Sequence, residues 1–276
     1  MCGRYAASAR PDELIEAFEV DLDATAEPAR SVLVSPQAPP PGQPDYNMAP
    51  TKQAPVVLSR PRGGGTGGAV RQLRHLTWGL VPSWSAEPKV GVRMINARSE
   101  TVLTSRAFAP AARSRRCLVP ARGWYEWQAS PVATDAKGRP RKQPFFISSA
   151  TETLVAFAGL YEFWRDETVQ DAADPAAWLT TFTIITTAAD PGLDRIHDRQ
   201  PLCLDPEDRA AWLGPETDVG EVESLLRFAR PGRFTAYPVS RAVSSSRSNG
   251  PSLLDPAPRE ELIGVVDPTT GEIIGA

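Results

Sequence analysis

Cys2 has the most distinctive chemical potential in this chain, because it directly follows the initiator methionine. Removal of Met1 would leave a cysteine that bears a free α-amine beside its thiol. An α-amine has a pKa of roughly 7.7–8.0, so about a tenth of it is neutral and nucleophilic at pH 7. Such an amine can condense with an aldehyde to a Schiff base, and the thiol can then close a thiazolidine ring. Cys2 is therefore a candidate for covalent capture of an aldehyde, although position alone also fits an incidental cysteine.

Two further side chains could supply acid–base chemistry. Glu126 lies in an aromatic segment, where Trp124 and Trp127 would exclude water and raise the pKa of the carboxyl. His197 is one of only two histidines, and an imidazole titrates near neutrality. Each also has a structural interpretation, since Glu126 could be an exposed strand residue and His197 a turn residue bonded to Asp198.

The other cysteines and the other histidine are interpreted as structural. Cys117 and Cys203 lie in apolar, strand-like runs, and His75 lies in an alternating strand pattern. Three cysteines are an odd count at no metal-like spacing, so neither a zinc site nor a disulfide framework is expected. We predict that the chemistry needs no metal ion and no organic cofactor.

Positive charge is concentrated in one part of an acidic chain. The 276 residues carry a net charge of −3, yet residues 89–127 hold eight basic and two acidic side chains. A local basic face of this kind is compatible with binding to phosphate groups. Considered by charge alone, a set of solvated arginines is the favoured interpretation of the same residues.

Many short strands and few helices must position these residues. Runs rich in apolar and β-branched residues predict strands at 55–59, 72–78, 116–119, 124–127, 144–148, 154–160 and 180–187. Helices are expected at 11–20, 205–213 and 217–229. Because strands dominate and do not alternate regularly with helices, the pattern predicts an α+β fold with a mainly antiparallel, barrel-like β core and a few flanking helices.

The remaining segments are interpreted from composition. The Gly-rich stretch at 60–68 and the polar stretch at 129–143 are expected to be flexible hairpin tips or insertions. Residues 251–276 are expected to form a C-terminal extension, either a hairpin or a loose tail. No apolar run reaches the ~18 residues of a membrane span, and the first residues do not resemble a signal peptide. A cytoplasmic location is therefore expected.

Nine short motifs follow one another in the order CGRY at 2–5, YNMAP at 46–50, WGLVP at 78–82, INARSET at 95–101, RCLVP at 116–120, GWYEW at 123–127, TTAAD at 186–190, IHDRQP at 196–201 and PVS at 238–240. Each motif is weak alone. The ordered set closely resembles the SRAP family of SOS-response-associated peptidases, or abasic-site-processing proteins, and it implies a single SRAP-like domain over residues 2–250.

The resemblance also implies roles for particular residues. The positions that match catalytic residues of the family are Cys2, Asn96, Glu126 and His197. The positions that match its DNA path are Arg4, Asn47, Trp84, Arg98, Arg106 and Arg199. Guanidinium groups suit phosphate oxygens, and an aromatic ring at the Trp84 position can stack on a base and splay the strand.

The implied function is capture of the ring-opened abasic aldehyde in single-stranded DNA by Cys2, as a thiazolidine cross-link that shields the lesion. A linked self-processing peptidase activity would remove Met1. The expected protein is a monomer that associates with the nucleoid when bound to DNA. Two rival functions use the same residues differently: a cysteine peptidase that acts on proteins, and a non-catalytic single-stranded DNA-binding module.

Overall fold

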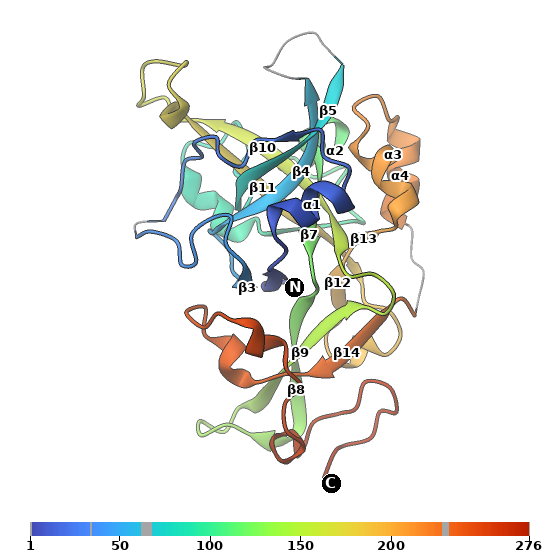
Figure 1. Ribbon diagram of the computed structural model, residues 1–276. Helices are drawn as coiled ribbons and strands as arrows, with labels where there is room; N and C mark the ends of the chain where they lie inside the picture. The colour runs from blue at the N-terminus through green and yellow to red at the C-terminus, as the bar shows by residue number, and fades with distance from the viewer. Residues whose placement is uncertain (1, 34, 62–67, 228–231, 276) are drawn as a thin grey trace.

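The computed structural model describes residues 2–33, 35–61, 68–227 and 232–275 (Figure 1). Its centre is a barrel of five strands, in the order β11-β10-β7-β4-β5. The barrel strands are β4 (Gln53–Pro61), β5 (Ala69–Trp78), β7 (Arg116–Ala121), β10 (Val155–Arg165) and β11 (Trp178–Ala188). Successive strands in this order pair in antiparallel fashion, and a short parallel pairing of β11 with β5 closes the barrel. The expected α+β fold with a mainly antiparallel, barrel-like core is confirmed.

A second sheet lies below the barrel in Figure 1, in the order β14-β9-β8-β1-β3. Its strands are β1 (Tyr5–Ala7), β3 (Asp45–Met48), β8 (Trp124–Thr134), β9 (Pro140–Ser149) and β14 (Phe234–Pro238). The chain passes from β7 in the barrel to β8 in this sheet through only two residues, Arg122 and Gly123. A Cβ on Gly123 would lie 2.3 Å from the carbonyl oxygen of Ile147, so only glycine allows this close approach.

Short edge strands and helices complete the fold. The edge strands are β2 (Leu22–Asp23), β6 (Asn96–Arg98), β12 (Arg199–Pro201) and β13 (Cys203–Leu204). The α-helices are α1 (Pro11–Ala17), α2 (Ala109–Ser114), α3 (Arg209–Leu213) and α4 (Val219–Arg227). The 3-10 helices are η2 (Pro88–Arg93), η3 (Pro175–Ala177), η4 (Leu193–Arg195), η5 (Pro206–Asp208), η6 (Arg241–Ser244), η7 (Pro251–Leu254) and η8 (Arg259–Leu262).

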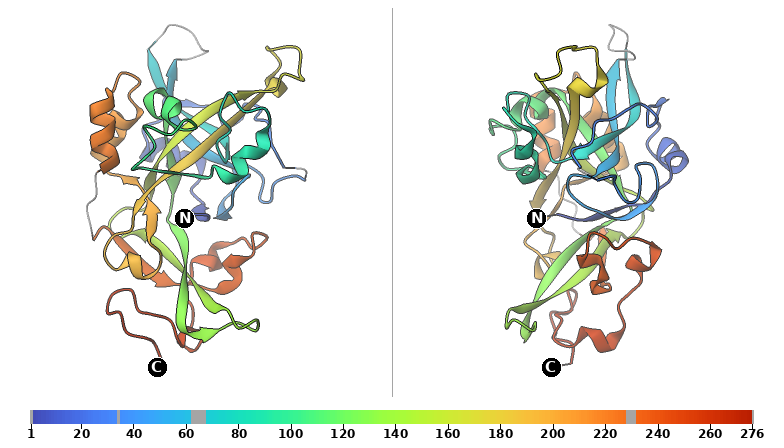
Figure 2. Two further views of the ribbon diagram at one scale, coloured as in Figure 1. Left: turned by 180° about the vertical axis from the view of Figure 1, so that it is seen from behind. Right: turned by 90° about the vertical axis from the view of Figure 1, so that its left-hand side faces the viewer.

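Two hydrophobic clusters share the barrel strands because successive side chains point to opposite faces. On β7, for example, Val119 belongs to an inner cluster that also contains Cys2, whereas Leu118 belongs to an outer one. Side chains of α1, α3 and α4 join the outer cluster, so these helices cover the outside of the barrel (Figure 1 and Figure 2). The inner cluster continues into the second sheet through Tyr5 and Trp124.

All the predicted strands are present, and several are longer than expected. The stretch 129–143, expected to be a flexible hairpin tip or an insertion, is the end of a hairpin, and β8 and β9 extend further into it than predicted, with an irregular register between Ala129 and Thr134. Only residues 135–139 turn, and the Asp135 carboxylate accepts backbone N–H groups of Lys137 and Arg139 there. In the stretch 60–68, β4 and β5 remain paired up to Pro61 and Ala69, and residues 62–67 lie outside the described part of the chain.

Residues 251–275 run beside the second sheet (Figure 2). Val239 and Pro256 form a β-bridge, and the Ala257 N–H donates to the Pro238 carbonyl. A second bridge joins Val266 to Ile273 in a tight hairpin. Within the described residues, no helix has both the length and the apolar character needed to cross a membrane.

Candidate active site

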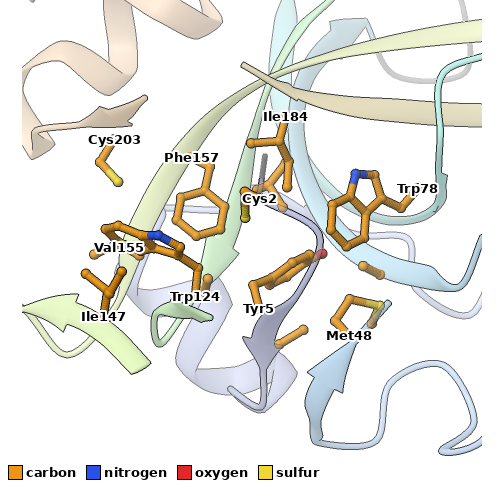
Figure 3. Close-up of a cluster of buried hydrophobic side chains, with 14 of the residues drawn as sticks. Cys2, Tyr5, Met48, Trp78, Trp124, Ile147, Val155, Phe157, Ile184 and Cys203 are labelled. Atoms are coloured by element: carbon orange, nitrogen blue, oxygen red, sulfur yellow. The ribbon is translucent and has the colours of Figure 1, made fainter. Parts of the chain in front are cut away.

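Cys2 lies at the junction of the barrel and the second sheet, three residues before the start of β1. Its side chain is fully buried among Tyr5, Phe157 and Ile184 (Figure 3). The Sγ atom is 3.8 Å from the carbonyl oxygen of Arg4. Burial raises the pKa of the Cys2 thiol well above its ordinary value, and the charge of Glu126 raises it further. The thiol is therefore neutral at physiological pH.

Glu126 lies on β8 and faces the same cluster as Cys2. Alternation along the strand places Trp124 and Glu126 on one face, and Trp124 belongs to the cluster around Cys2. Burial raises the pKa of Glu126 to about 7, and the nearby charge of Asp198 acts in the same direction. Trp127, which the sequence suggested would also cover this carboxyl, points to the opposite face, where its Nε1 donates to Ser244.

Asn96 reaches the same site from β6. It is paired in register with Ile184, so the two side chains project from the same face of the sheet toward the Cys2 cluster. Both polar atoms of the Asn96 amide and the Oε1 atom of Glu126 are buried without a hydrogen-bond partner among the described residues. Leaving such a group unpaired costs about 1–3 kcal/mol, so unpaired groups that share a site indicate a place prepared for a polar ligand.

His197 follows the turn that leads into β12. Its Nδ1 accepts a hydrogen bond from the Arg199 N–H at 3.0 Å and lies 3.0 Å from a carboxylate oxygen of Asp198. The first contact fits the neutral ring and the second fits the protonated ring, so both protonation states have a partner. Burial lowers the pKa of His197, and the charge of the chain's amino group lowers it further.

Electrostatic interactions connect the three titratable groups of the site. The charge of Glu126 raises the pKa of Cys2, and the charge of Asp198, which contacts the His197 ring, raises the pKa of Glu126. The structure thus brings together a thiol, a carboxyl and an imidazole from three separate parts of the chain.

Arg4 and Asn47, both expected to contact DNA, form one hydrogen-bonded unit. The Asn47 Oδ1 accepts from Nη1 of Arg4 at 2.8 Å. The Asn47 amide nitrogen donates to the carbonyl oxygens of Val243, Ser245 and Ser248, and the side chain is fully buried. Asn47 therefore orients Arg4, and its amide N–H groups are already occupied by the protein.

Trp84 and Arg106 form an exposed pair. The Trp84 side chain is 53% exposed, and the guanidinium carbon of Arg106 lies 4.7 Å from the centre of its ring. This is a cation–π arrangement on the surface. An aromatic face with an adjacent positive charge suits both a base and its phosphate.

Arg98 and Arg199 flank the end of β11 from either side. Arg98 pairs with Thr186 through β6, and Arg199 pairs with Ala188 through β12. Arg98 is exposed, whereas Arg199 makes a two-pronged ion pair with Glu100, at 2.6 and 2.9 Å. The sequence did not predict that Glu100 would pair with Arg199. The only indication was that an acidic residue occurs within the INARSET motif.

Of the residues interpreted as structural, Cys117 and Cys203 are buried and His75 is half-buried. Cys117 and Cys203 are buried free thiols whose pKa values burial raises. The Nδ1 atom of His75 lies 3.2 Å from the Thr25 carbonyl oxygen, and burial lowers the pKa of that ring. Among the residues that the structure describes, no three His, Cys, Asp or Glu side chains group as metal ligands.

Fold and site together define a β-barrel protein whose second residue, a cysteine, is enclosed with a carboxyl of raised pKa and an imidazole. The SRAP family, described as SOS response associated peptidase, matches residues 1–246, and the chain belongs to this family. It is 34% identical to the abasic site processing protein YoqW of Bacillus subtilis, over 92% of this chain and 99% of that protein. It is also 34% identical to the abasic site processing protein HMCES of Rattus norvegicus, over 78% of this chain and 65% of that protein.

Solved structures show the same fold. A protein from Bacteroides thetaiotaomicron superposes with a TM-score of 0.71 at 23% identity, covering 93% of this chain and all of the other. A phage-related protein from Bordetella bronchiseptica superposes with a TM-score of 0.59 at 31% identity, covering 87% of this chain and 95% of the other. The likeness extends over most of the chain in both.

Proposed function

We propose that this protein processes abasic sites by forming a covalent thiazolidine with the ring-opened sugar aldehyde in single-stranded DNA. The observation that carries the proposal is the enclosure of Cys2 with the unpaired amide of Asn96 and the unpaired Oε1 of Glu126. The similarity to proteins named abasic site processing proteins supports the choice of substrate.

The proposed reaction begins at the amine of Cys2 after loss of Met1. Because the buried thiol is neutral, the unprotonated amine is the first nucleophile. It adds to the aldehyde carbon, and loss of one water gives the imine. The thiol sulfur then adds to the imine carbon while its proton passes to the imine nitrogen, so the net change is the release of one water.

Glu126 and His197 are proposed to move the protons. A carboxyl with a pKa of about 7 can protonate the leaving hydroxyl and take a proton back from the thiol at neutral pH. His197 can protonate the sugar ring oxygen as the ring opens, since both of its protonation states are accommodated. Asn96 is proposed to orient the aldehyde oxygen or the amine.

The DNA strand is proposed to follow the exposed arginines. Arg98 and the pair of Arg106 with Trp84 present charge and an aromatic face at the surface. Arg4, held by Asn47, and Arg199, held by Glu100, have fixed orientations for binding phosphate.

We further propose that the site around Cys2 removes Met1 by hydrolysis. The protein is also proposed to act as a monomer in the cytoplasm, on DNA of the nucleoid.

A denaturing gel with a single-stranded oligonucleotide that carries one abasic site tests the proposal. We expect a shifted, heat-stable band, and mass spectrometry should map the adduct to the first residue of the mature chain, Cys2. An adduct on Cys117, Cys203 or a lysine would contradict the mechanism. Peptide cleavage without an adduct would favour the cysteine peptidase, and native binding without an adduct would favour the binding module.

A further inference from the structure

The C-terminal segment is hydrogen-bonded to the strand that carries Glu126. Gln128 lies two residues further along β8, on the same face as Glu126, and is 2% exposed. Its amide pairs with the backbone of Val266 in both directions, accepting from the N–H at 2.8 Å and donating to the carbonyl at 2.9 Å. Ser130 continues the contact, because its hydroxyl donates to the Gly264 carbonyl at 2.5 Å.

The same segment also holds the turn that carries His197. The guanidinium of Arg195 donates to the carbonyl oxygens of Pro268 and Thr269, at 2.6 and 3.1 Å. The carbonyl of Arg195 in turn accepts from the Gln128 amide at 3.1 Å. Gln128 therefore lies on the strand that carries Glu126, and its side chain bonds both to the turn that carries His197 and to the C-terminal segment.

Apolar packing fixes this arrangement. Leu262 and Val265 of the C-terminal segment are buried in the cluster that contains Cys2. Leu193 and Ile196, on either side of Arg195, belong to the same cluster. The His197 N–H then donates to the Leu193 carbonyl, so the position of the imidazole follows from that of the turn.

We infer that residues 262–271 act as a clamp that sets the distance between Glu126 and His197, with Gln128 and Arg195 as its positioning residues. Neither residue is proposed to touch the DNA. The kinetic part of this inference rests on the proposed function, whereas the geometric part concerns His197 and can be measured without DNA.

The two histidines of the chain allow a direct test by NMR of the imidazole nitrogens across a pH titration. The charged groups that act on His197 are the amino terminus, Asp198 and Lys142, and all remain in the variants. Arg195→Ala removes an exposed side chain together with its hydrogen bonds to Pro268 and Thr269. Gln128→Leu removes the central amide at similar volume. Arg139→Ala, which breaks an exposed ion pair with Asp135 on the same hairpin, is the matched control.

We expect both clamp variants to shift the His197 resonances and to raise the pKa of His197, because the ring gains solvent. The His75 resonances should not move. On abasic single-stranded DNA the adduct should form about 10- to 100-fold more slowly, since small misplacements of catalytic groups have effects of this size. DNA affinity should change by less than about twofold, because phosphate contacts and stacking determine it. Arg139→Ala should match the wild type in every measurement.

The inference is overturned if His197 titrates as in the wild type in both Arg195→Ala and Gln128→Leu. Should Gln128→Leu fail to fold, Arg195→Ala alone decides. If the wild type forms no adduct while the clamp variants still shift His197, the proposed function fails and the clamp stands. If the wild type forms the adduct and the clamp variants leave the His197 titration unchanged, the clamp fails and the proposed function stands.

Discussion

At the scale of single residues, the site buries two polar side chains at a cost in stability. Beside the fully buried Cys2, Glu126 is 3% exposed, and the Asn96 amide lacks a partner among the described residues. Natural proteins retain such groups chiefly where they act on a ligand. Burial of these side chains therefore accounts both for a cost in the free energy of unfolding and for the proposed reactivity. Replacing one such side chain allows both effects to be measured.

Replacement of Cys2 separates the two steps of the proposed reaction. Cys2→Ala should still allow an imine at its α-amine but should give no heat-stable adduct, because no thiol can close the ring. Cys2→Ser should likewise leave mainly an imine, which borohydride would trap. Native gels should show DNA affinity within about twofold of wild type in both, since binding rests on arginines and stacking. A heat-stable band in Cys2→Ala without borohydride would exclude ring closure by this thiol.

Replacement of Glu126 should stabilise the protein at high pH and slow its chemistry. With a folded pKa of about 7 against an ordinary 4.5, the folded chain keeps a proton that the unfolded chain has lost between these values. Stability therefore falls as pH rises from about 4.5 to about 7, by about 3 kcal/mol in total. Glu126→Gln lacks this loss, so its advantage in urea unfolding should be larger at pH 8 than at pH 5.

The kinetic counterpart uses the same variant. Without its acid–base group, Glu126→Gln should form the adduct about 10²- to 10⁴-fold more slowly than wild type. Glu162→Gln is a control, since Glu162 is a buried carboxyl on β10 that pairs with Arg115. Wild-type rates in Glu126→Gln would remove this carboxyl from the proton-transfer scheme.

At the scale of elements, short connections do more positioning than the long strands. The two-residue link between β7 and β8 turns the chain out of the barrel and aims Trp124 and Glu126 at the site. The three-residue strands β6 and β12 add to β11 and place Asn96, Arg98 and Arg199 at one end of it. The loop between β5 and η2 presents Trp84 to solvent.

The link at Gly123 predicts a specific loss of stability. Gly123→Ala places a Cβ against the Ile147 carbonyl, so the backbone must shift and the free energy of unfolding should fall by about 1–3 kcal/mol. Gly68→Ala is the control, because a Cβ there meets no atom of the described residues within 4 Å. Thermal unfolding of both variants measures the difference, and equal midpoints would contradict the close-approach argument.

The exposed tryptophan predicts a loss of DNA affinity. Trp84→Ala should weaken binding to single-stranded DNA by about 1–3 kcal/mol if the ring stacks on a base. Trp178→Ala is the matched control, since Trp178 is 39% exposed and also lies under an arginine, Arg165, at the other end of β11. Fluorescence anisotropy with a labelled oligonucleotide compares them, and equal affinities would rule out stacking at Trp84.

The sequence predicted the long elements and the candidate residues better than the contacts among them. The run 180–187 consists only of threonine, isoleucine and phenylalanine, which all favour strands, so it predicts a strand from local preference. The strands β6 and β12 have three residues each and exist because they pair with β11, which no local pattern reveals. The bonds of Gln128 to Val266 join residues far apart in the chain and gave no signal at all.

At the scale of the whole molecule, the proposed path and site predict which DNA is chosen. An abasic site within a duplex must be distorted out of its stack, at a cost of a few kcal/mol. Single-stranded sites should therefore react at least ~10-fold faster than matched duplex sites at one salt concentration. Equal rates on both DNAs would contradict the proposed path even if Cys2 reacts.

The proposed path also predicts the salt dependence of binding. Replacing Arg98 should reduce the slope of log affinity against log salt by about one, if Arg98 neutralises one phosphate.

The burial of Cys2 among residues from the rest of the chain also has a consequence for biosynthesis. The ribosome makes Cys2 at the start of synthesis, but Val265, which packs in the same cluster, is made more than 250 residues later. At about 5–20 residues per second, the start of the chain waits roughly 10–50 seconds before its enclosure can be complete. Because the proposed removal of Met1 uses the assembled site, it cannot begin during that interval. Maturation of the reactive terminus is therefore expected to follow translation, after the last strands and the C-terminal segment have folded.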